Sequence, residues 1–278
     1  MTHTNPGFIS IIRRETKTYK KRLQRCRRKM GVENVHKLRI GIRRLLALIA
    51  LFQHLAPQTG LHKLQRRLKR QLDDLDELRD IHVMQETLAN EMPALVELEP
   101  FLQYLQARQQ SVLTQVAKRI AASARRKIHR KINQAGQSVQ SALAGSDFEA
   151  GLIAGIDALY QTVLQRYQRV DPASASSIHN LRIALKKLRY TLLLTQALIP
   201  PLPEQYIQRL QAHLSCMGEI QNSTVLQACI QDFFQGKPPS QVRQSLQNRH
   251  QQLMETYMGQ RTEVLQFWRR HDHRSFNN

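Results

Sequence analysis

Apolar residues recur three and four positions apart, the spacing of one face of an α-helix, in each stretch of the chain between its breaks. The first stretch shows the pattern at Phe8, Ile12, Tyr19, Leu23, Cys26 and Met30. No stretch alternates apolar and polar residues with the period of two that a half-buried β-strand requires. The hydrophobic pattern therefore predicts an all-α fold.

Glycine and proline gather at the breaks and divide the chain into eight segments that we expect to be helical. The breaks lie at residues 30–34, 56–60, 90–100, 144–147, 170–177, 199–204 and 235–240. The fourth segment, 99–143, is long for one helix, and we expect it to break near residues 121–123 or at Gly136.

The chain repeats itself at an offset of about 143 residues. HKLRIGIRRL (36–45) matches HNLRIALKKL (179–188), with identical or similar residues at eight of ten positions. About forty positions further on, LDELRDIHVM (75–84) matches MGEIQNSTVL (217–226). The repeat predicts a duplicated four-helix unit, in which one domain (1–278) consists of an N-terminal half (8–143) and a C-terminal half (146–269).

On a helical wheel, the second and sixth segments each separate into an apolar stripe and a basic row. In the second segment, the apolar stripe that we expect in the core consists of Val35, Leu38, Ile42, Leu45, Ile49 and Phe52. In the sixth segment, it consists of Ile178, Leu181, Leu185, Leu188 and Leu192. The basic row of the second contains His36, Arg39 and Arg43, with Arg44 on its flank. The row of the sixth contains His179, Arg182, Lys186 and Arg189, with Lys187 on its flank.

The net charge of the chain helps to interpret these basic rows. The chain has 42 Lys and Arg against 21 Asp and Glu, a formal net charge of +21. Like charges stacked on one helix face destabilise it by about 0.2–0.5 kcal/mol per pair unless an anion binds there. A solvated face is the plainer interpretation of one basic helix, but the recurrence of the row in both halves favours a polyanionic partner.

Two other segments carry cations away from their apolar faces. The first segment places Arg14, Lys17 and Lys21 on one side, and they are candidates for the same ligand. The fourth segment carries a cluster from Lys118 to Lys131, which contributes either to the ligand site or only to the general positive field.

Histidine and cysteine spacings predict no cofactor, no metal site and no catalytic residue. His36 and His179 have Arg or Lys one turn on and no carboxylate, which disfavours a bound cation. We expect both to act as phosphate-contacting donors. The cysteines, Cys26, Cys216 and Cys229, have no CxxC spacing, and we expect buried reduced thiols.

The acidic segment DDLDELRD (73–80) is the strongest indication of an enzyme. Asp73, Asp76 or Glu77, and Asp80 lie on one helical face, as the carboxylates of a divalent-metal site would. The second half keeps only Glu219 in this place. We therefore favour salt bridges to the chain's own Arg and Lys, with a metal-dependent phosphohydrolase as the alternative.

These motifs resemble the CHAD domain, the conserved histidine α-helical domain. The resemblance rests on HxxRxxxRR at 36–44, HxxRxxxKKLRY at 179–190 and the two downstream segments, and it extends from Phe8 to Trp268. It implies two four-helix bundles related by pseudo-twofold symmetry and packed around a basic channel that binds inorganic polyphosphate without catalysis. It places along that ligand His36, Arg39, Arg43, Arg44, His179, Arg182, Lys186, Lys187 and Arg189.

The sequence departs from the family pattern at two positions. Leu46 stands where the first-half pattern has another Arg, so the basic row there is one residue shorter. Asn222 replaces the usual Asp, which affects the internal ion pair of the second half but not its ligand face.

Polyphosphate carries charge but no bases, so its site needs Arg and Lys in a line without stacking aromatics. Aromatic residues are 6% of the chain, and beside the rows only Tyr190 is aromatic. This argues against single-stranded nucleic acid and leaves duplex-backbone binding as an alternative. No apolar run is long enough to span a membrane and no secretory signal begins the chain, so we expect a cytoplasmic protein, associated with polyphosphate granules.

Overall fold

The computed structural model describes residues 6–57, 60–92, 95–123, 128–142, 148–172, 174–203 and 205–268. These residues form helices and no β-strand, so the all-α prediction is confirmed. The elements are α1 (Pro6–Arg28), α2 (Val32–Leu55), α3 (His62–Asp73), α4 (Asp76–Glu91), η2 (Val96–Leu98), α5 (Glu99–Ser123), α6 (Ile128–Ala142), α7 (Phe148–Gln168), α8 (Ala175–Thr195), α9 (Tyr206–Phe233), α10 (Ser240–Gln260) and η3 (Arg261–Gln266).

Two of the eight predicted segments differ from a single helix. The third forms α3 and α4, because the chain turns at Asp74 and Leu75. The turn places Asp76 in the first turn of α4, where a carboxylate interacts favourably with the helix dipole. The fourth forms two helices: α5 ends at Ser123 and α6 begins at Ile128. Residues 124–127, between them, lie outside the described residues.

The sequence repeat has a counterpart in the order of helices. α1 corresponds in position to α7, α2 to α8, α3 with α4 to α9, and α5 to α10. α6 has no partner in this correspondence among the described residues, and it packs on α1 and α2. The turn between α3 and α4 is also particular to the first half, because α9 runs without interruption through the equivalent positions.

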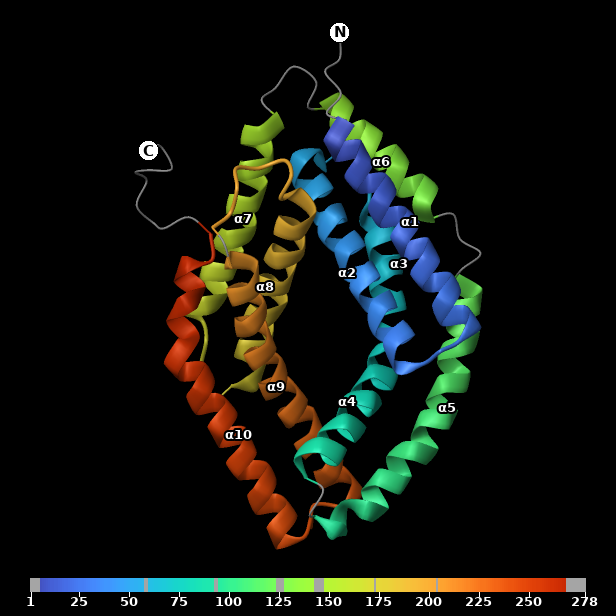
Figure 1. Cartoon of the computed structure of the whole chain (residues 1–278), viewed down its shortest axis with the longest axis vertical. Coiled ribbons are helices and arrows are strands. Elements are labelled where there is room, and N and C mark those ends of the chain that lie inside the picture. Colours follow the sequence, from blue (N-terminus) through green and yellow to red (C-terminus); the bar gives the residue numbers. More distant parts are fainter. Residues whose placement is uncertain are drawn as a thin grey trace.

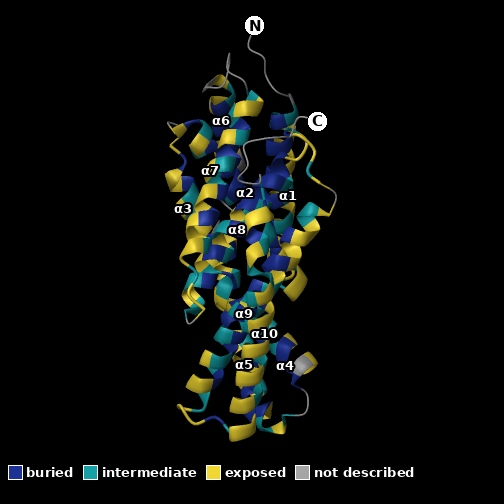
Figure 2. Ribbon diagram, turned by 90° about the vertical axis from the view of Figure 1, so that its left-hand side faces the viewer, coloured by how far each residue is buried: buried dark blue, intermediate teal, exposed yellow. Residues whose placement is uncertain are grey.

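α2 and α8 lie at the centre of the molecule and pack against each other (Figure 1). α1, α3 and α6 pack on α2, and α7 and α9 pack on α8. α4 also packs on α9 lower in the same view. Seen from the side, the end that contains α4, α5, α9 and α10 is narrower than the end that contains α1, α6 and α7 (Figure 2).

The apolar core consists of two clusters of buried side chains. One gathers residues of α1 to α6 and the other residues of α7 to α10, but the division is not strict. Leu226 and Ile230 of α9 and Val242 and Leu246 of α10 belong to the first cluster, so the C-terminal helices also bury apolar surface against the N-terminal ones. Each half therefore contributes to the packing of the other.

The three cysteines are free. Cys26 is buried as expected, and burial raises the pKa of its thiol to about 11. Cys216 and Cys229 are only half-buried, so the expectation of full burial was wrong for them. Each lies on α9, with its side chain packed against the margin of an apolar cluster rather than inside it.

Candidate anion-binding site

The basic rows of α2 and α8 are brought to one region because their apolar stripes are buried on both helices. Every predicted stripe residue, from Val35 to Phe52 and from Ile178 to Leu192, has an exposed fraction of at most 1%. α2 packs on α8, and Arg39 and Arg43 of α2 lie near enough to Arg182 and Lys186 of α8 to lower the pKa values of both. The predicted core stripes are therefore confirmed.

Four cations form what we call the central cluster: Arg39 and Arg43 of α2, and Arg182 and Lys186 of α8. Arg39 is buried, and the other three are half-buried. Burial, and then the charge of Arg43, lowers the pKa of Arg182 to about 10. Burial, followed by Arg43, Arg182 and Arg39, lowers the pKa of Lys186 to about 6. The four side chains therefore repel one another, and an anion among them would relieve this repulsion.

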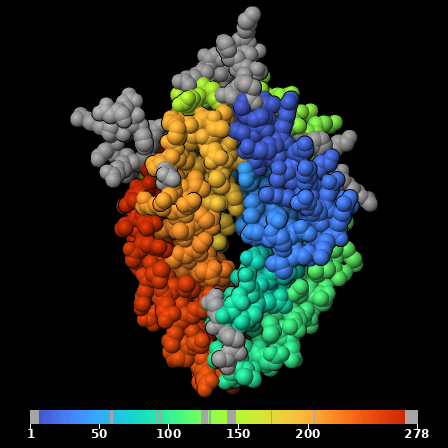
Figure 3. Space-filling model, in the orientation of Figure 1, coloured from blue at the N-terminus to red at the C-terminus, as the bar shows by residue number. Residues whose placement is uncertain are grey.

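The surface is hollowed near these helices. Figure 3 shows a hollow in the middle of this face, between orange residues of α9 and the blue and teal residues of α2 and α4. α2 carries Arg39 and Arg43, and α4 and α9 carry polar partners of the central cluster.

The two halves hold their equivalent arginines differently. Arg39 pairs with Asp76 at the start of α4 and also donates to the carbonyl oxygen of Leu72, at 3.4 Å. Arg182 donates through Nε to the carbonyl oxygen of Leu214, at 3.5 Å. Gly218 stands where α4 has Asp76, and a Cβ atom there would lie 2.9 Å from Nη2 of Arg182. The guanidinium of Arg182 thus rests against α9 where Arg39 has a carboxylate.

The two histidines of the basic rows have different surroundings, because His36 is exposed and His179 is half-buried. Partial desolvation and then Arg79 of α4 lower the pKa of His36. Partial desolvation lowers the pKa of His179, while a hydrogen bond with Gln221 of α9 raises it. Arg79 and Gln221 are equivalent in the repeat. Burial therefore disfavours the charged form of both imidazoles.

Not every predicted site residue is equally available. Arg44 pairs with the buried carboxylate of Glu15 on α1, at 2.7 and 2.8 Å, and Arg14 pairs with the same carboxylate at 3.1 Å. Both are therefore partly neutralised within the protein. Lys17, Lys21 and Lys187 are exposed. Arg189 lies over the ring of Tyr190, 5.6 Å from its centroid.

Three residues near the cluster were not among the predicted site residues. Arg22 of α1 lies against Gly41 of α2, where an added Cβ atom would be 3.3 Å from its side chain. Arg79 influences His36, and the hydroxyl of Tyr190 hydrogen-bonds with Arg43. The sequence marked Arg79 through its repeat pairing with Gln221 and Tyr190 as the aromatic residue beside the rows. It did not mark Arg22, which lies off the basic row of α1.

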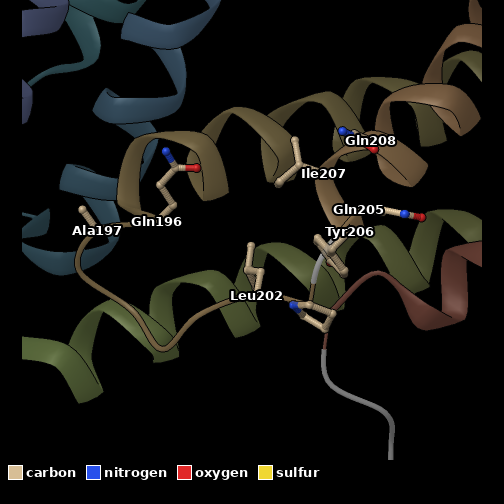
Figure 4. Close-up of a pocket in the computed structure, with 8 residues that line it drawn as sticks. Gln196, Ala197, Leu202, Gln205, Tyr206, Ile207 and Gln208 are labelled. Carbon is tan, nitrogen blue, oxygen red and sulfur yellow. The ribbon is translucent and has the colours of Figure 1, made fainter.

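Two pockets elsewhere in the molecule do not coincide with the central cluster. One, of about 530 Å³, lies at the connection from α8 to α9, and the eight described residues that line it carry no formal charge (Figure 4). The other, of about 480 Å³, lies between α4, α5 and α9, and its lining contains five carboxylates, among them Asp76, the partner of Arg39, against one cation, Arg108. Neither suits a polyanion.

Comparison with known proteins decides the family. The model of the CHAD domain matches residues 10–231, from α1 to the end of α9. The chain belongs to the CHAD domain family. The crystal structure of the CHAD domain from the plant Ricinus communis is similar, with a TM-score of 0.65 and 20% identity over 94% of this chain and 89% of that chain. No curated protein matches this sequence.

The acidic segment of this CHAD domain is engaged in ion pairs. Asp76 pairs with Arg39, Asp74 with Arg119 at 3.3 Å, and Glu77 with Arg108 at 2.5 Å. The interpretation as internal salt bridges is confirmed for these three carboxylates. Within the described residues, no group of three or more His, Cys, Asp or Glu side chains is arranged to hold a metal ion, and no helix is long and apolar enough to cross a membrane.

The depressed pKa of Lys186 predicts a pH-dependent effect on stability. Between its folded pKa of about 6 and its ordinary value of 10.5, only the unfolded chain binds the proton, so this residue increasingly favours unfolding as the pH falls through that range. Lys186→Met is expected to raise the thermal midpoint by roughly 2–4 °C at pH 7, equivalent to about 1 kcal/mol. The gain should shrink toward pH 10. Thermal denaturation across pH 6–10 measures it, with the exposed Lys63→Met as control. A gain independent of pH would mean that Lys186 stays protonated.

Proposed function

We propose that this CHAD domain binds inorganic polyphosphate without catalysing its hydrolysis, and that it associates with polyphosphate granules. In this proposal, the halves 8–143 and 146–269 are two bundles whose facing helices α2 and α8 border a basic channel. The observation that carries the proposal is the central cluster, in which equivalent cations from both halves lie close enough to lower the pKa values of Arg182 and Lys186. A linear polyanion is the ligand that would neutralise several of them at once.

The chemistry of the cluster suits phosphate rather than nucleobases. Arg39, Arg43 and Arg182 supply planar donors for bidentate contacts, and Lys186 supplies a point charge once a bound anion raises its pKa. Tyr190, the aromatic residue adjoining the rows, has an exposed fraction of only 8% and hydrogen-bonds with Arg43. A base would have no face of that ring to stack on, which favours a ligand without bases.

Two alternatives are distinguished by their chemistry. Duplex nucleic acid presents phosphates alone to a basic surface, and the net charge of +21 favours it as a second candidate. A metal-dependent phosphohydrolase would use Asp73, Asp76 and Asp80, but Asp76 is paired with Arg39. The ion pairs of the acidic segment therefore support a structural role for it.

A competition experiment tests the proposal. Fluorescently labelled polyphosphate is expected to bind the full chain, and duplex DNA at equal phosphate concentration is expected to displace less than half of it. Complete displacement by DNA would favour nucleic-acid binding. The polymer recovered after incubation with Mg²⁺ or Mn²⁺ should keep its length on a gel, whereas shortening that is lost in Asp76→Asn or Asp80→Asn would establish the hydrolase.

A further inference from the structure

The two halves of the central cluster differ in their counter-charge. Arg39 is buried and has the carboxylate of Asp76 as its partner. At the equivalent place on α9, Gly218 has no side chain, and the neighbouring Glu219 pairs with Arg249 of α10 at 3.3 Å. Asn222 donates to the same carboxylate, at 3.4 Å. The one carboxylate nearby on α9 is thus turned toward α10, and Arg182 has no ion pair within the described residues.

This difference affects how an anion would bind. A phosphate approaching Arg39 must compete with Asp76 and meets repulsion from it. A phosphate approaching Arg182 meets no carboxylate that is paired with it. Burial, and then the charge of Arg43, lowers the pKa values of Arg182 and Lys186, and these effects outweigh the opposing ones of Glu219 on Arg182 and of Asp76 on Lys186. The free energy available from an anion is therefore larger in the second half.

We infer that the site is asymmetric: polyphosphate anchors on Arg182 and Lys186 of α8, and Asp76 limits affinity by competing with the ligand for Arg39. This inference rests on the proposed function and assigns a role to a residue outside the predicted ligand contacts. Asp76 acts as a built-in anion, which the bound polymer displaces from Arg39.

Exchange of the carboxylate between the halves tests the asymmetry. Asp76→Asn is expected to raise polyphosphate affinity by about three- to tenfold at about 0.1 M salt, and Gly218→Asp to lower it by a similar factor. Gly218→Ala separates the steric effect of a Cβ atom, 2.9 Å from Arg182, from the effect of the charge. Asp74→Asn, which frees the exposed Arg119 instead, is the matched control and should change affinity less than twofold.

A second pair of variants compares the two equivalent arginines directly. Arg39→Met with Asp76→Asn removes the ion pair at constant net charge, and affinity is expected to stay within about twofold. Arg182→Met is expected to lower it by about tenfold or more. Titration calorimetry on folded variants, verified by circular dichroism, gives both values.

The outcomes separate the inference from the proposed function. Absence of polyphosphate binding by the unaltered chain overturns the function. Binding by the unaltered chain, with unchanged or weaker affinity in Asp76→Asn, overturns the asymmetry alone. Equal losses in Arg182→Met and in the Arg39, Asp76 double variant would do the same.

Discussion

Replacing Arg39, Arg43, Arg182 and Lys186 together with alanine is expected to lower polyphosphate affinity by about a thousandfold or more. Each of these cations would make at least one charge-assisted hydrogen bond to phosphate, and losing four removes the core of the site. The variant should stay folded, because the apolar stripes beneath the rows are unchanged and the relief of repulsion within the cluster offsets the loss of the Arg39–Asp76 ion pair. We expect its thermal midpoint to equal or exceed that of the unaltered chain.

The control variant has the same net charge as the quadruple variant and replaces the same types of residue. Arg66, Arg70, Arg243 and Lys237 are exposed cations on α3, on α10 and in the turn before α10. Alanine at these four positions removes the same three arginines and one lysine from outside the cluster. We expect this control to lose no more than about tenfold, through the general field. Equal losses in the two variants would show that charge acts without a defined site.

Salt is expected to weaken binding steeply. A polymer that contacts about eight cations releases condensed counterions, and roughly 0.7 per contact gives a slope near −6 in a plot of log affinity against log salt. Raising salt from about 50 to 200 mM should therefore lower affinity by about 10³–10⁴-fold. The dissociation constant measured at five or six salt concentrations gives the slope.

The quadruple alanine variant provides an internal check on the same plot. Its slope should become shallower by about 3, because four of the contacts that release counterions are lost. The charge-matched control should keep the slope of the unaltered chain. A slope near zero for the unaltered chain would contradict binding through the cationic rows.

Most of the fold could be predicted from the helical periodicity of the sequence. The stripes from Val35 to Phe52 and from Ile178 to Leu192 were predictable because burial of one face imposes a 3.6-residue period on the sequence. The basic rows followed from the same wheel. The break at Asp74 and Leu75 was not predictable, because Leu68, Leu75 and Leu78 keep a helical period through it and all are buried.

The partners of the site residues were harder to obtain from sequence. The pairing of Arg44 with Glu15 depends on how α1 packs on α2. A helical wheel of either segment alone does not show this packing. Arg22 was missed for the same reason, since it approaches the site across Gly41 rather than along its own basic row. The acidic segment was predictable in kind but not in partner, as Asp76 with Arg39 shows.

A crystal structure of the chain with bound polyphosphate tests the central claim most directly. The polymer should lie along the central cluster, with phosphate oxygens within hydrogen-bonding distance of Arg43, Arg182 and Lys186 at once. Polymer bound on the outer faces of α3, α5 or α10, with the central cluster empty, would contradict it.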